Sequence, residues 1–317
     1  MRRVIGFTLT ELLISMLLAM FLLGMAVTAF TGISHSLRQT QQLAELQQNA
    51  QLLMNLLQNE LGNVGFWGGR SVPEQALSFT IPAAPAADCT DDVAGSGSFP
   101  QAGTDFITLY GRVADSGRQL NCIPSAILGS EILQLKRLVG QQTLPSDIRT
   151  NRFYLETTWQ HSRLVDAASS GLSTEHQYYP YQHLVLYVQQ QRHDGRQLPV
   201  LMRKRLVRNS AGFASISTDS ILDGVERLHF QFGVDTDMDG QINALLATEQ
   251  MPAHFWRQGD NRILSLRYYA LLRARKPDMT YRNNQVYQMG IHSFDAAGDN
   301  YRRLLVSSNI YFYNAAL

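Results

Sequence analysis

The segment with the clearest capacity for chemistry is a short acidic run at residues 235–240, which has the form D-x-D-x-D-G. Carboxylates at alternate positions, with a glycine at the sixth, match the start of a calcium-binding loop of the EF-hand type. In such a loop the seventh residue offers a backbone carbonyl, and the ninth can offer a side chain. The candidate Ca²⁺ ligands are therefore Asp235, Asp237, Asp239, Gln241 and Asn243.

The same run departs from a calcium loop at its twelfth position. An EF-hand loop places a bidentate acid there, whereas this chain has Leu246. Glu249 or Glu226 could replace that acid only if the fold brought it close. An Asp-Gly pair between alternating apolar runs is also a signal for the turn of a β-hairpin. The sequence leaves two interpretations open, a Ca²⁺ site and a plain hairpin turn.

The chain has two cysteines, Cys89 and Cys122. Their separation matches neither a zinc site nor a redox motif. If this part of the chain is exported, one disulfide is the simple interpretation, and closing the loop would stabilise the fold by roughly 3–4 kcal/mol. If it stays in the cytosol, both are expected to be free thiols. The cysteines alone do not decide between a disulfide and two free thiols.

No other group of residues suggests catalysis. The eight histidines are scattered without metal-site spacing, and we find no G-x-S-x-G motif, no phosphate-binding loop and no nucleophile with an evident base. The formal net charge of +1 does not indicate the strongly basic surface that is typical of nucleic-acid-binding proteins. We therefore expect neither an enzyme with a small-molecule substrate nor a nucleic-acid-binding protein.

One acid interrupts the apolar N-terminal segment. Residues 7–30 are apolar apart from Glu11 and four hydroxyl-bearing side chains, and they are long enough to span a bilayer as a helix. Arg2 and Arg3 precede the segment and should stay in the cytoplasm, which places the rest of the chain outside it. A lone carboxylate in a membrane span is costly unless it is paired, so Glu11 is a functional candidate.

Cleavage of the chain would supply a partner for Glu11. A cut between Gly6 and Phe7 creates an ammonium group about one helical turn from Glu11, and staggered neighbouring chains could then neutralise one another. Two simpler interpretations are an ordinary signal peptide, cleaved after the small residues 27–29, and an uncleaved membrane anchor. Neither of them explains Glu11.

Residues 6–14, GFTLTELLI, resemble the prepilin processing signature of type IV pilin-like proteins. The resemblance implies cleavage after Gly6 by prepilin peptidase, N-methylation of Phe7, and an assembly salt bridge made by Glu11. It also implies four parts of the chain: a leader at 1–6, a transmembrane or filament-core segment at 7–30, an amphipathic helical half at 31–62, and a periplasmic β-rich head at 63–317.

The helical pattern continues past the apolar segment. No proline interrupts residues 7–61, and glycines follow. A helix of about 55 residues would be about 80 Å long. Its second half carries an apolar stripe that we expect to dock on the head, the alternative being a short coiled-coil stalk. The stripe consists of Leu43, Leu46, Ala50, Leu53, Leu57 and Leu61.

The rest of the chain predicts antiparallel β-structure, so the fold class is α+β. A Pro-, Ala- and Gly-rich surface loop is expected at residues 82–104, and two lobes could meet near residues 140–175. Alternating apolar runs rich in β-branched and aromatic residues predict strands. The runs are 105–113, 131–139, 152–159, 183–190, 199–207, 225–234, 263–273 and 304–313.

Three head segments, at 224–240, 265–273 and 302–314, resemble the PilW family of minor pilins. That resemblance implies a minor pilin at or near the pilus tip that primes filament assembly, with roles in cell adhesion and twitching motility. Its partners would be other minor pilins, the major pilin, a large adhesin-like tip protein, prepilin peptidase and the inner-membrane assembly platform. The alternatives are a J-type minor pseudopilin of type II secretion and a membrane-anchored periplasmic binding module.

Overall fold

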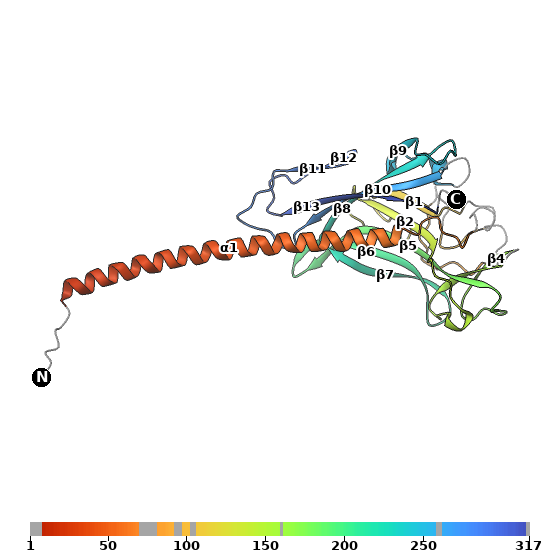
Figure 1. Ribbon diagram of the computed structural model, residues 1–317, viewed down its shortest axis with the longest axis horizontal. Coiled ribbons are helices and arrows are strands. Elements are labelled where there is room, and N and C mark those ends of the chain that lie inside the picture. The colour runs from red at the N-terminus through yellow and green to blue at the C-terminus, as the bar shows by residue number, and fades with distance from the viewer. Residues whose placement is uncertain are drawn as a thin grey trace.

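The computed structural model describes residues 8–69, 81–91, 97–101, 106–158, 161–257 and 262–314. The predicted processing residues Gly6 and Phe7 lie outside these ranges. The described chain consists of one long helix, α1, and a body of antiparallel sheets on which the second half of the helix lies (Figure 1). The predicted α+β class is confirmed.

Helix α1 (Leu9–Leu61) agrees with the predicted helix. It begins with a capping box, in which the backbone N–H of Thr8 donates to Glu11 Oε2 over 2.9 Å and the backbone N–H of Glu11 donates to Thr8 Oγ1 over 3.4 Å. These bonds satisfy backbone donors that the first helical turn leaves without partners. The helix ends at Gly62.

The two halves of α1 have different surroundings. Its second half packs against β13, β10 and β7, whereas the first half projects from the body (Figure 1). Leu43 is 41% exposed, so the docked stripe begins one turn later than predicted. The buried members of the stripe are Leu46, Ala50, Leu53, Leu57 and Leu61.

A seven-stranded sheet forms the larger part of the body. The 17-residue strand β5 organises it, because β5 pairs with β3, β2 and β6 along successive parts of its length. Residues 140–175, where a seam was expected, contribute two strands to this sheet. Its strands are β1 (Leu109–Val113), β2 (Glu131–Leu138), β3 (Phe153–Thr157), β4 (Ser162–Val165), β5 (Gln177–His193), β6 (Arg196–Arg208) and β7 (Ala214–Asp223).

A four-stranded sheet, in the order β13-β10-β8-β9, completes the core. The two sheets and the helical stripe share one hydrophobic cluster, so helix docking and head folding depend on the same buried surface. A separate two-stranded hairpin is formed by β11 and β12. The bounds are β8 (Val225–Asp235), β9 (Ala244–Ala247), β10 (Arg262–Arg273), β11 (Val286–Met289), β12 (His292–Asp295) and β13 (Arg303–Tyr311); short 3₁₀ turns lie at Pro145–Asp147, Thr248–Gln250 and Ala253–Trp256.

Cys89 and Cys122 form a disulfide, which confirms the pairing expected for an exported head. Both residues are buried. The bond ties the segment at residues 81–91, which has neither helix nor strand, to the loop between β1 and β2. A cross-link between residues 33 apart in sequence stabilises the fold by roughly 3–4 kcal/mol, because it reduces the conformational entropy of the unfolded chain.

Candidate functional site

The projecting half of α1 is a large apolar surface. Every residue from Leu9 to Ile33 is exposed, and side chains such as Leu17 and Phe21 are 71% and 64% exposed. A helix that is apolar on all sides needs an apolar environment, either lipid or other helices. Within the described ranges, α1 is the one helix long and apolar enough to cross a membrane.

Glu11 lies at the beginning of this surface. Its Oε2 accepts both hydrogen bonds that Thr8 donates, from the backbone N–H over 2.9 Å and from the hydroxyl over 2.8 Å. These neutral donors satisfy the carboxylate locally but do not compensate its charge. The salt bridge expected between Glu11 and a freed amine stays a prediction.

The acidic run forms the turn of the β8–β9 hairpin, so the predicted hairpin turn is confirmed. The carboxylates of Asp235, Asp237 and Asp239 offer oxygens that all lie within 4.8 Å of one another. The two oxygens of Asp235 accept the backbone N–H groups of Met238 and Gly240, each over 2.8 Å. Burial raises the pKa of Asp235, but the hydrogen bonds from Gly240 and Met238 outweigh it and hold that pKa below its usual range.

Of the other predicted ligands, Asn243 is engaged within the protein. Asn243 Oδ1 accepts the backbone N–H of Thr236 over 2.7 Å. Leu246, at the twelfth position, lies in β9 opposite Phe232. Glu226 stands nine residues before Asp235 on the same strand, roughly 30 Å away, so it is excluded as a substitute ligand.

Glu249 is also occupied elsewhere, because its carboxylate lies 3.3 Å from Nε2 of His292. Both candidates for a twelfth-position acid are thus removed from the turn. The three aspartates remain close together without the bidentate ligand that gives calcium loops much of their affinity.

Calcium binding by this turn is therefore predicted to be weak, with a Kd of about 10⁻⁴–10⁻³ M. Titration of the detergent-solubilised chain by calorimetry should give this value, and about 10 mM Ca²⁺ should raise Tm by roughly 2–5 °C. The D237N/D239N variant should lose both effects. Equal Ca²⁺ responses of the two proteins would leave the hairpin turn as the complete explanation.

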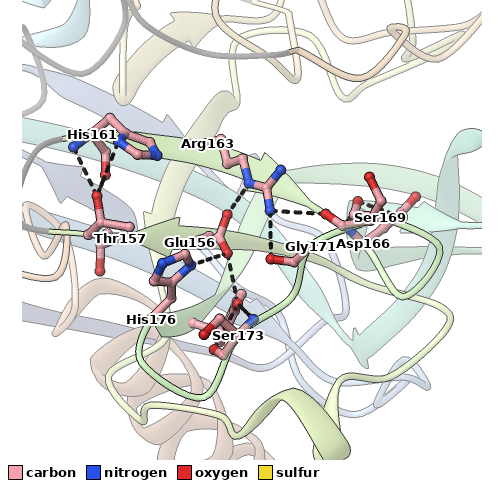
Figure 2. A network of polar contacts seen from close by, with 12 residues as sticks. Glu156, Thr157, His161, Arg163, Asp166, Ser169, Gly171, Ser173 and His176 are labelled. Carbon is pink, nitrogen blue, oxygen red and sulfur yellow. Dashed lines mark hydrogen bonds and ion pairs between the residues drawn. The ribbon is translucent and has the colours of Figure 1, made fainter.

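A second polar network surrounds Glu156, which is buried on β3 (Figure 2). Its carboxylate accepts hydrogen bonds from Arg163, from His176 Nδ1 over 2.8 Å and from the Tyr178 hydroxyl over 2.7 Å. Burial raises the pKa of Glu156, but these three donors lower it further than burial raises it. The network joins the β3–β4 hairpin to the start of β5, and it holds the connecting loop in place.

Residues 185–314 match the model of PilW, described as type IV pilus-assembly protein W. This segment is similar to the PilW family. The match covers about two fifths of the chain, from within β5 to beyond β13. All three head segments that resembled the family lie inside it. No curated protein and no solved structure matches the chain.

The PilW segment carries the acidic turn and the two strands on which α1 docks most extensively. It contains neither α1 nor the disulfide. The family match therefore supports a role related to type IV pilus assembly independently of the N-terminal signature.

Proposed function

We propose that this chain is a minor pilin that primes type IV pilus assembly from a position at or near the filament tip. The observation that carries the proposal is the form of α1, a single uninterrupted helix. Its first half is apolar and exposed, and a stripe along its second half is buried against a head that contains the PilW-like segment. Such a helix lies in the membrane before assembly and among the helices of other pilins afterwards.

The head then faces the periplasm and reaches the cell exterior as the filament grows. The chain acts by packing rather than by chemistry: the assembly platform supplies work, and α1 supplies an apolar surface for its neighbours. The partners that this role requires are the major pilin, other minor pilins and an adhesin-like tip protein. Prepilin peptidase would first cleave after Gly6 and methylate Phe7.

Replacement of Gly6 tests this function directly. In cells that contain prepilin peptidase, mass spectrometry of the unaltered chain should find a mature N-terminal peptide beginning with methylated Phe7. Gly6→Val should abolish that peptide, accumulate the precursor and strongly reduce surface pili, because the uncleaved leader prevents release into the filament.

Gly24→Ala is the matched control. Gly24 lies in the same apolar half, and a Cβ added there meets nothing within 4 Å, so this variant should be cleaved and assembled normally. A mature chain that begins at Phe30, as a signal peptide would produce, contradicts the proposal. Normal piliation by Gly6→Val would do so as well.

A further inference from the structure

A buried group of three titratable side chains lies where the sheets of the head meet. Glu131 begins β2 of the seven-stranded sheet, His229 lies on β8 of the four-stranded sheet, and His292 begins β12 of the small hairpin. Glu131 is fully buried and His229 is 4% exposed. One potential ligand atom from each residue lies within 4.8 Å of the other two.

The separations within this group are those of a coordination shell. Oε1 of Glu131 lies 3.0 Å from Nδ1 of His229 and 3.6 Å from Nε2 of His292. Oε2 of Glu249 lies 3.3 Å from the same Nε2. Adjacent ligands of a tetrahedral zinc ion, with bonds of about 2.1 Å, stand about 3.4 Å apart.

The remaining contacts orient these ligand atoms. Oε2 of Glu131 accepts a hydrogen bond from the Thr248 hydroxyl and another, over 3.1 Å, from the backbone N–H of Phe230. Both bonds direct Oε1 toward the histidines, as outer-shell partners do in metal sites. The two imidazole rings are stacked, with their centroids 4.2 Å apart.

The group is partly satisfied within the protein, since His229 Nδ1 and Oε1 of Glu131 form a hydrogen bond over 3.0 Å. Nε2 of His292 is buried and has no hydrogen-bond partner among the described residues, although it lies near two carboxylates. A neutral imidazole can coordinate a metal ion through either of its ring nitrogens.

We propose that Glu131, His229 and His292 bind a divalent transition-metal ion of the zinc type, with Glu249 as the fourth ligand on the solvent side. Imidazole nitrogens with carboxylate oxygens form a suitable tetrahedral set for Zn²⁺. Two ionised carboxylates neutralise its charge.

The ion joins three sheets at one point. Its ligands come from β2, β8 and β12 and from the 3₁₀ turn Thr248–Gln250. It fixes the β11–β12 hairpin, which lies beside the four-stranded sheet (Figure 1), to the rest of the head. The site is therefore structural, and its binding energy adds to the free energy of unfolding.

The test uses the full-length chain in detergent after removal of metals with a chelator. Calorimetric titration with Zn²⁺ should show one site per chain and should raise Tm, and Co²⁺ should give the visible absorption of a tetrahedral site. His292→Ala should weaken Zn²⁺ binding at least tenfold, since even outer-shell changes cost about 10–100-fold.

Glu249→Gln provides the second variant, because its side chain is 44% exposed and the change should leave the fold intact even if His292→Ala does not fold. It should also weaken Zn²⁺ binding at least about tenfold. His193→Ala is the matched control: this side chain is 60% exposed and lies outside the group, so zinc affinity should not change. Absence of stoichiometric zinc binding, or equal affinity of Glu249→Gln and the unaltered chain, would overturn the proposal.

Discussion

Glu11→Ala is expected to leave the head folded while removing the chain from assembled pili. Glu11 lies on the projecting half of α1, far along the helix from its first buried residue, Leu46, so head stability should not change. In the filament, its carboxylate is expected to pair with the amine freed at Phe7 of a neighbouring chain. Quantitative immunoblots of sheared pilus and membrane fractions should show the variant retained in the membrane.

Glu11 also accepts the backbone N–H of Thr8 in the capping box at the start of α1. A further variant must therefore separate its role in capping from its role in a salt bridge. Glu11→Gln can maintain a capping box, since Gln serves at that position as Glu does, but it removes the charge. The salt-bridge account therefore expects Glu11→Gln to fail as Glu11→Ala does. Thr8→Ala is the complementary control: it removes the cap side chain, costs about 1 kcal/mol of helix stability and retains the charge, so it should assemble. Normal assembly by Glu11→Gln would assign the role of Glu11 to capping instead.

The sequence predicted the long elements well because their patterns are long. α1 agrees with a predicted helix whose stripe repeats over several turns, and every predicted strand run overlaps an observed strand. Four of the missed strands, β4, β9, β11 and β12, have four residues each, which is too short for a period-2 pattern to stand out. The longer β7 was missed because polar residues are interspersed among its apolar ones.

The candidate sites were predicted to different extents. The acidic turn was visible because its residues are contiguous, and T-x-x-E at residues 8–11 was a visible capping signal that the membrane interpretation of Glu11 obscured. The group of Glu131, His229 and His292 has no local spacing at all. Its members come from three sheets, so only the tertiary arrangement brings them together. Whether Glu249 or Glu226 could replace the acid at the twelfth position of the calcium loop also depends on the tertiary arrangement, and the fold excludes both.

Glu226→Ala is expected to lower the free energy of unfolding by about 3–5 kcal/mol. Glu226 on β8 is 6% exposed and accepts hydrogen bonds from Arg303 on β13 over 2.6 Å and from Arg273 on β10 over 3.2 Å. It thus links three neighbouring strands of the sheet on which α1 docks. Truncation removes a counter-charge from two guanidinium groups in a buried site, and Arg303 then keeps Asp299 as its ion-pair partner.

Urea denaturation of the detergent-solubilised chain measures this loss, and the exposed pair Arg275–Asp223 supplies the control. Both of its side chains are about two fifths exposed, so Arg275→Ala should cost less than about 1 kcal/mol. Glu226→Gln should fall between the two, because it retains hydrogen-bond acceptance without the charge. A loss of unfolding free energy for Glu226→Ala no larger than that for Arg275→Ala would show that the network adds nothing to stability.

If the expected order is found, Glu226→Ala should also weaken the docking of α1 on the head. The reason is that β10 and β13 carry both the network and much of the surface that buries α1.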